Sequence, residues 1–309
     1  MVGTGNRTTI HQGTRAQRTP RLAVMRGTVT AIVLGIAVNL ISASPLEAQQ
    51  GSTSELAASH SSVRDRDSNG AGERADILAR VLRTDSNASL RRNAAWGLAR
   101  FANSSVGSQA LAAALEHDAS ADVRETSAWS LSQSGATAPD AVSALDRALR
   151  SDGSPSVRAT SAWALGQLRV SGSNDALEAA LRDPDPGVRQ RAIWAVGHVR
   201  YRTAPAELVS GLRDPDPHVR SLAAWALMSI GDHATIPALK SAFLAEADPH
   251  LRIDDMHALA SMGDASLDAI RSILESPDRT IQARGVEALS NGRASGPWPW
   301  PWPDPRPFP

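Results

Sequence analysis

The line VRATSAWALGQL at residues 157–168 decides the fold, because the chain repeats it on both sides with few changes. Its five copies share a tryptophan at one position, with spacings of 33, 34, 31 and 31 residues: Trp96, Trp129, Trp163, Trp194 and Trp225. Two weaker copies follow at residues 251–262 and 281–292, where His257 and Glu287 hold that position. A period near 31 residues predicts stacked helical pairs, because one pair cannot bury its apolar face alone.

The segments between these lines have the apolar periodicity of further helices. Each precedes a turn and one repeated line, which predicts seven pairs, or about fourteen helices, between residues 73 and 291. The chain has 309 residues, of which 42% are hydrophobic and only 4% aromatic. This composition favours thin, repetitive helix packing over one large core. The absence of cysteine excludes disulfides, thiolate nucleophiles and thiolate metal sites.

The turns carry a second repeated pattern. Asp185 and Asp216 are placed as helix N-caps, and Pro186 and Pro217 fit the first helical position, where no N–H is needed. An acid stands six residues before the arginine of each line. The acids are Asp85, Asp118, Asp152, Asp183, Asp214 and Glu246, and the arginines are Arg91, Arg124, Arg158, Arg189, Arg220 and Arg252. We expect a ladder in which each arginine meets the acid of its own or a neighbouring turn, with little stabilisation where a rung is exposed.

These lines resemble HEAT repeats of the short variety named after phycobilisome lyases, with its D-x-D-x-x-V-R-x-x-A-A-x-A-L-G pattern. The resemblance covers residues 73–291. It implies an all-α, right-handed α-solenoid, similar to the armadillo superhelix, with the arginine-bearing second helix of each pair lining the concave side. It also implies a scaffold without a cofactor, which binds a protein or peptide partner.

Enzymes of the same fold family remain the alternative function. The family includes a di-iron hydroxylase acting on deoxyhypusine, whose ligands are His-Glu dipeptides, and it includes bilin lyases. This sequence has no His-Glu dipeptide and no HExxH motif, and nothing marks a chromophore site. No catalytic triad, phosphate loop or paired-carboxylate site stands out, so we expect no catalytic and no metal-binding residues.

The tryptophans are predicted to face away from the apolar stripe of their helices. On residues 188–199, Trp194 lies about 140° from the centre of the stripe, and His198 follows four residues later on the same face. The corresponding partners elsewhere are Arg100, Gln133, Gln167 and Ser229. The candidate partner-binding residues on the concave surface are therefore Trp96, Trp129, Gln133, Trp163, Gln167, Trp194, His198 and Trp225. The alternative is that each indole fills the gap between neighbouring repeats.

This row is similar to the peptide groove of armadillo proteins, where an asparagine follows each tryptophan by four residues. Here the amide ladder is reproduced only through Gln133 and Gln167.

The C-terminal tail, residues 292–309, reads GRASGPWPWPWPDPRPFP. Proline at every second position forbids a helix and favours an extended chain from which Trp298, Trp300 and Trp302 project. Its composition is typical of a disordered tail. The alternative is a stiff aromatic segment that docks on a groove of this protein or of a partner.

The N-terminal residues 1–48 are expected to be an extension and a signal peptide, at about residues 25–48. The apolar run at 29–41 is short for a bilayer span, arginines precede it, and Ala48 suits a cleavage site. An uncleaved membrane anchor is the alternative, and the start can be Met1 or Met25. We therefore expect a secreted or periplasmic protein, with a flexible linker at 49–72 and no membrane span after cleavage.

Charge argues against a nucleic-acid partner. The whole chain has 32 basic and 32 acidic residues, and removal of residues 1–48 takes away five arginines and one glutamate, leaving a net charge of −4. Nucleic-acid binding draws most of its affinity from clustered positive charge.

Two acids in the sixth repeat depart from the pattern. Asp254 lies on one helix face with His250 and His257, but no fourth metal ligand is identifiable, so a solvated polar face is expected. Asp255 takes a position that is Ala or Ser in repeats one to five, where we expect it to weaken packing or to pair with an arginine.

Overall fold

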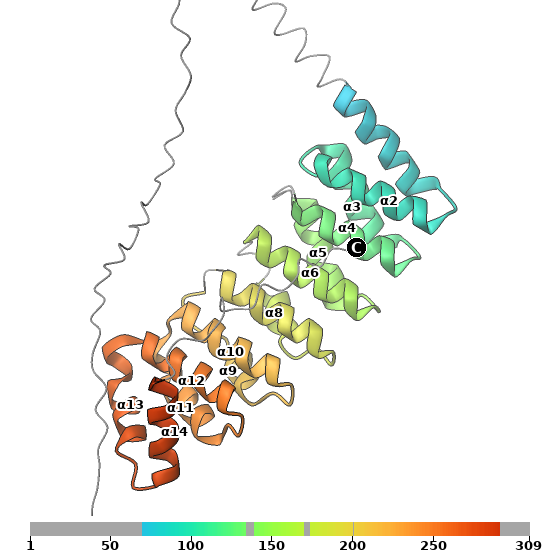
Figure 1. The fold of residues 1–309 in the computed structure, drawn as a ribbon. Helices are drawn as coiled ribbons and strands as arrows, with labels where there is room; N and C mark the ends of the chain where they lie inside the picture. The colour runs from blue at the N-terminus through green and yellow to red at the C-terminus, as the bar shows by residue number, and fades with distance from the viewer. Residues whose placement is uncertain (1–69, 134–138, 170–173, 200, 291–309) are drawn as a thin grey trace, which may run out of the picture. The chain divides into compact units, whose positions relative to one another are not determined.

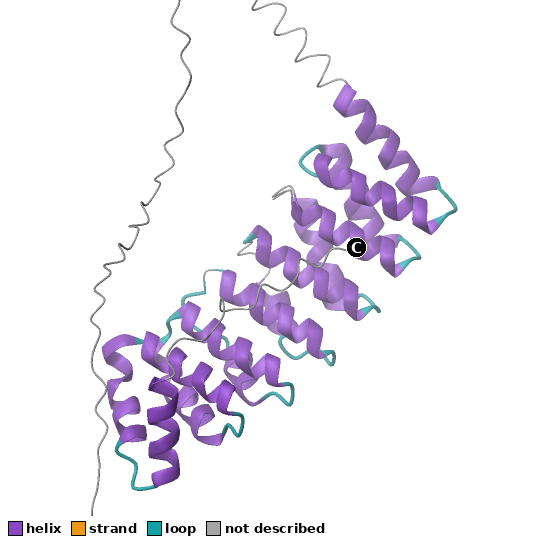
Figure 2. Cartoon of the chain, viewed as in Figure 1, coloured by secondary structure: helices purple, strands orange, loops and turns teal. Residues whose placement is uncertain are grey.

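The computed structural model describes residues 70–133, 139–169, 174–199 and 201–290, whose helices belong to one compact unit. Within these residues every regular element is a helix (Figure 2). The predicted signal peptide and the tail tryptophans Trp298, Trp300 and Trp302 lie outside the described residues. None of the described helices has the length and apolar content required to cross a bilayer.

Seven consecutive helical pairs fill the described part of the chain, which confirms the predicted all-α solenoid. The first helices are residues 70–84, α3 (Ser105–His117), α5 (Pro139–Ser151), α7 (Asn174–Ala180), α9 (Ala206–Ser210), α11 (Ile236–Ala245) and α13 (Leu267–Leu274). The second helices are α2 (Ala88–Leu98), α4 (Ala121–Gln133), α6 (Pro155–Leu168), α8 (Pro186–His198), α10 (Pro217–Ile230), α12 (Pro249–Ser261) and α14 (Arg279–Ser290). Short 3-10 turns extend or precede some of them: η1 (Ala99–Phe101), η3 (Gly211–Arg213), η4 (His233–Thr235) and η5 (Gly263–Ser266).

The pairs stack in chain order (Figure 1). Each second helix packs against its own first helix and against the second helices of the neighbouring repeats, so α6 contacts α5, α4 and α8. The residue two positions after the tryptophan site is fully buried in the first six repeats: Leu98, Leu131, Leu165, Val196, Leu227 and Leu259. The core is therefore a continuous layer between the two helix rows, built from one contribution per repeat.

The second helices begin where the sequence predicted. The Asp185 carboxylate accepts a hydrogen bond of 3.1 Å from the Val188 N–H, and Asp216 accepts one of 2.9 Å from the His218 N–H. Pro186 and Pro217 are the first helical residues of α8 and α10. The starts of α8 and α10 are thus fixed by capped turns, which set the register of the tryptophans that follow.

Candidate binding face on the second helices

The arginine–acid ladder joins each turn to the next repeat. In the third repeat, Arg158 donates from Nε and Nη2 to both carboxylate oxygens of Asp183, at 2.8 and 2.9 Å. Its Nη1 also donates to the backbone carbonyl of Asp152 in its own turn, at 2.9 Å. The five rungs are Arg91–Asp118, Arg124–Asp152, Arg158–Asp183, Arg189–Asp214 and Arg220–Glu246. The predicted arginine therefore meets both turns, with its charge paired to the following repeat.

The rungs are shielded from solvent. Their acidic side chains are between 6% and 11% exposed, so they are not the weak surface pairs considered from the sequence. Burial by itself raises the pKa of the Asp152 carboxyl, but hydrogen bonds from Arg124 and from the Ser154 N–H outweigh it and lower that pKa below its ordinary value. The same causes, with their own partners, lower the pKa of Asp118 and of Glu246. The ladder is therefore built to hold its charges in a partly buried seam.

The ladder ends at the sixth repeat. Arg252 is 7% exposed and donates to the backbone carbonyls of Glu246 and Ala247, at 3.3 and 2.9 Å. The position where the seventh repeat should supply an acid is Ser276. Asp255, near the Arg220–Glu246 rung, is 6% exposed and forms no ion pair within the described residues. Of the two alternatives for Asp255, pairing with an arginine is therefore wrong, because the nearby guanidinium of Arg220 is already bound to Glu246.

The predicted exposed row of tryptophans is wrong for three of its members. Trp129, Trp163 and Trp225 are only 6%, 4% and 7% exposed, while Trp96 and Trp194 are half-buried. The tryptophan side chains do point away from the apolar stripe of their own helix, but they enter the space between adjacent second helices. Neighbouring repeats therefore cover rings that a single isolated helix would leave in water.

Glycines in the preceding repeat make room for two of these rings. A side chain begun at Gly166 would come within 2.8 Å of Cζ3 of Trp194, and one begun at Gly197 within 2.6 Å of Cη2 of Trp225. Both glycines stand three residues after the tryptophan of their own repeat. Glycine at this position is a sequence signal of ring burial that the analysis of single helices missed.

The rings form two stacked groups along the second helices. Trp96 and Trp129 lie face to face, with centroids 4.3 Å apart and planes 5° from parallel. Trp163 and Trp194 are 6.5 Å apart, and the His198 imidazole lies 4.0 Å from Trp194 and 5.3 Å from Trp225. Nδ1 of His198 donates to the Trp194 carbonyl at 2.9 Å, which fixes the imidazole between the two indoles. The aromatic groups are thus mainly packing elements between repeats.

The polar residues that follow the tryptophans by four positions lie at the surface. We call Arg100, Gln133, Gln167, His198 and Ser229 the polar row. Four of them are exposed, and His198 is half-buried. The Gln133 amide donates to Ser132 Oγ at 3.3 Å. Of the predicted partner-binding residues, it is therefore the glutamines that the structure leaves exposed, whereas Trp129, Trp163 and Trp225 are buried.

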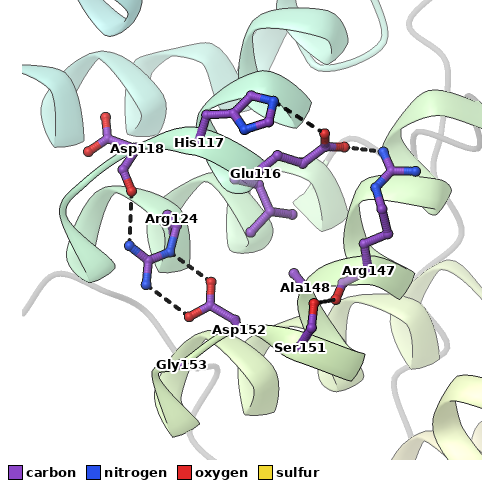
Figure 3. Close-up of a pocket in the computed structure, with 10 residues that line it drawn as sticks. Glu116, His117, Asp118, Arg124, Arg147, Ala148, Ser151, Asp152 and Gly153 are labelled. Carbon is purple, nitrogen blue, oxygen red and sulfur yellow. Dashed lines mark hydrogen bonds and ion pairs between the residues drawn. The ribbon is translucent and has the colours of Figure 1, made fainter.

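A hollow of about 410 Å³ lies at the turn end of the second and third repeats (Figure 3). Its charged side chains are already paired, because Arg124 binds Asp152 and Arg147 binds Glu116. His117 lies 3.6 Å from Glu116 at its rim. The hollow lies between two rungs, and its charged side chains are bound to each other rather than available to a ligand. Within the described residues no group of three or more His, Asp or Glu residues could hold a metal ion.

Stacked helical pairs with buried arginine–acid rungs define an α-solenoid of the scaffold class. The chain belongs to the HEAT-repeat family: HEAT repeats match residues 75–166 and 174–259, which is more than half of the sequence. No curated protein matches the chain in sequence.

Solved structures of similar fold include helical-repeat proteins of low sequence identity to this chain. YibA of E. coli is 22% identical, over 70% of this chain and 81% of that one, with a TM-score of 0.51. Kap121p is 13% identical, over 72% of this chain and 30% of that one, with a TM-score of 0.50. The CpcE–CpcF complex of phycocyanin lyase from Nostoc is 23% identical, over 72% and 89%, with a TM-score of 0.45. At these identities the first two likenesses concern the fold alone.

Proposed function

We propose that this protein is an exported, non-catalytic HEAT-repeat scaffold that binds an extended segment of a protein or peptide along the polar row. The observation that supports this proposal is the exposure of Gln133 and Gln167 at repeat spacing, on helices whose indoles, Trp129 and Trp163, are buried. Surface side chains carried by tightly packed helices lose little conformational entropy when a ligand binds them. The tryptophans contribute rigidity, and the amides contribute recognition.

The spacing of the row suits an extended backbone. Packed helices lie about 8–10 Å apart, so one repeat corresponds to about three residues of an extended chain. A glutamine amide can donate to a peptide carbonyl and accept from a peptide N–H at the same time. Gln133, Gln167 and His198 stand in three successive repeats. We infer that they contact a partner segment of about six to nine residues.

The test is affinity capture from the cell envelope with the full-length chain and with the double variant Gln133→Ala, Gln167→Ala. We expect the double variant to lose at least about tenfold in affinity for the captured partner, since each lost hydrogen bond contributes about 1 kcal/mol. Gln109→Ala is the matched control, because Gln109 is an exposed glutamine on the first helix α3. Equal capture by both variants would place the binding site elsewhere.

Export is proposed on the layout of residues 25–48 in the sequence. The mature protein recovered from the producing cell should then begin at or near Gln49. N-terminal sequencing measures this directly. A mature chain that retains residues 25–48 would contradict export by cleavage and favour the membrane-anchor alternative.

A further inference from the structure

Exposed large apolar side chains gather in the first and last helical pairs. Within the described residues five of the six belong to these pairs, namely Ile77, Leu90, Leu267, Val286 and Leu289, and the sixth is Leu244 on α11. A solenoid end needs a polar outer face or a cover, because its last repeat has no following neighbour to bury its apolar positions. The last pair here has an apolar end.

Val286 and Leu289 hold positions that are core positions in every preceding repeat. Val286 is 52% exposed, whereas the six equivalent residues are at most 1% exposed: Ala95, Ala128, Ala162, Ile193, Ala224 and Met256. Leu289 is 39% exposed, whereas its six equivalents, from Leu98 to Leu259, are 0% exposed. The exposure of α14 therefore comes from the end of the repeat stack and not from a change to a polar sequence.

A second copy stacked end to end fits this surface poorly. In such a stack the first ladder acid, Asp85, would face the arginine position of the seventh repeat. That position is Gln282, whose amide already donates to the Leu274 carbonyl at 2.9 Å. The joint would lack the charged rung that links the first six repeats to one another.

The tail of the same chain fits better. The chain continues directly from Ser290, the last residue of α14, and residues 291–296 include Gly292 and Gly296, which permit a reversal of direction. The remaining thirteen residues alternate proline with tryptophan, aspartate, arginine or phenylalanine. As a polyproline-type strand they would span about 40 Å, more than the roughly 18 Å length of a twelve-residue helix.

We propose that residues 297–309 fold back and cap the outer face of the last helical pair, with the tail indoles covering Val286 and Leu289. The flat rings supply the apolar area that an eighth repeat would have supplied. The pre-extended proline backbone loses little entropy on docking. This cap is independent of the polar row, so it can fail without affecting the proposed function.

Crosslinking in the full-length chain tests the cap, since the sequence contains no cysteine of its own. The double variant Leu289→Cys, Trp300→Cys should form an intramolecular disulfide under mild oxidation, seen as an intact monomer on a non-reducing gel and by mass spectrometry. The control is Glu287→Cys, Trp300→Cys, which has nearly the same tether length but places the thiol on nearly the opposite face of α14. We expect the control to react at least about tenfold more slowly.

Two results would overturn the cap. Disulfide-linked dimers or larger species would show that a second copy covers the end, and equal reaction rates in the test and control variants would show an unattached tail.

Hydrogen exchange gives a second readout without cysteines. The triple variant Trp298→Ser, Trp300→Ser, Trp302→Ser keeps every proline and leaves the repeat body unchanged. Amides of α14 should exchange about tenfold faster than in the parent chain, the factor expected for uncovering one aliphatic side chain. Exchange in α6 should stay the same. Unchanged exchange in α14 would contradict the cap.

Discussion

The fourth and sixth repeats share a backbone plan but differ in what holds them to the next repeat. In the fourth, Arg189 binds both oxygens of Asp214, and Trp194 lies over Gly166. In the sixth, Arg252 meets only backbone carbonyls, and His257 replaces the tryptophan. The comparison teaches that cohesion between repeats comes from two separable side-chain devices, the rung and the indole. Among the described residues, neither the rung nor the indole joins the sixth repeat to the seventh.

The carboxyl pKa values are shifted in opposite directions in the central rungs and in the sixth repeat. Around the central rungs, hydrogen bonds from Arg124 and Ser154 overcome the effect of burial and lower the pKa of Asp152. In the sixth repeat, burial raises the pKa of Asp255 to about 8, with Glu246 and Asp254 adding to the shift and Arg220 opposing it. Burial also raises the pKa of Asp254 to about 7, against the hydrogen bond from Ser221.

A lowered pKa means that the rung stabilises the fold above the unfolded value near 4, and that this stabilisation is lost as the pH falls further. A raised pKa means that the unfolded chain ionises first. The sixth repeat therefore loses stability as the pH rises from about 4 towards about 8.

The largest expected effect is on a buried ring of the central region. Trp163→Ala should lower the free energy of unfolding by about 3–5 kcal/mol, because it leaves a cavity between α6 and its neighbours. Urea denaturation measures the loss. Trp96→Ala, at a half-buried ring with no preceding second helix among the described residues, should cost clearly less. Equal losses would contradict the assignment of Trp163 to inter-repeat packing.

The second largest loss of stability is expected when one arginine–acid rung loses its acidic charge. Asp152→Asn should destabilise the protein by about 3 kcal/mol, because it leaves the Arg124 guanidinium shielded from water without a charged partner. Asp146→Asn is the control, since its pair with Arg150 is exposed and should contribute less than about 0.5 kcal/mol. Thermal melts of the two variants at pH 7 make the comparison. The same loss from both would mean that the rungs are ordinary surface pairs.

A smaller, pH-dependent effect is expected in the sixth repeat. Asp255→Asn should stabilise the last two pairs by about 2 kcal/mol more at pH 8 than near pH 5, since the acid is ionised only in the unfolded chain between these values. Urea unfolding at both pH values, followed by hydrogen exchange in α12, measures it. A gain that is independent of pH would show that Asp255 is ionised in the folded protein.

The smallest effect concerns a helix start. Asp185→Ala removes the side chain that accepts from the Val188 N–H and should cost about 1 kcal/mol. Asp185→Asn retains an acceptor and should cost a few tenths of that amount. Differential scanning calorimetry of the two variants separates the cap from a general effect of charge.

The repeated line was sufficient to predict the fold. The seven copies of the line predicted seven pairs, and the Asp-Pro dipeptides predicted the starts of α8 and α10. The ladder residues were also identified, although only the structure shows that each arginine binds the acid of the following repeat. Which acid an arginine binds depends on how far neighbouring helical pairs are offset from each other, and the sequence of a single repeat does not determine this offset.

The burial of the tryptophans could not be read from one helix at a time. The wheel of residues 188–199 places Trp194 opposite the core stripe, but the covering surface belongs to the neighbouring repeat. Gly166 and Gly197 carried the missing information, because a small residue three positions after one tryptophan accommodates the next ring. The glutamines were predicted as surface groups, and both Gln133 and Gln167 are exposed.

Hydrogen exchange across the seven repeats of the unmodified chain, at pH 8 and pH 5, tests most directly whether rungs and indoles hold the stack together. After correction for intrinsic rates, α4 to α10 should exchange together and slowly at both pH values. At pH 8 α12 and α14 should exchange at least about tenfold faster, and the gap should narrow at pH 5. Equal protection in all seven second helices, or a gap that widens at pH 5, would contradict the account.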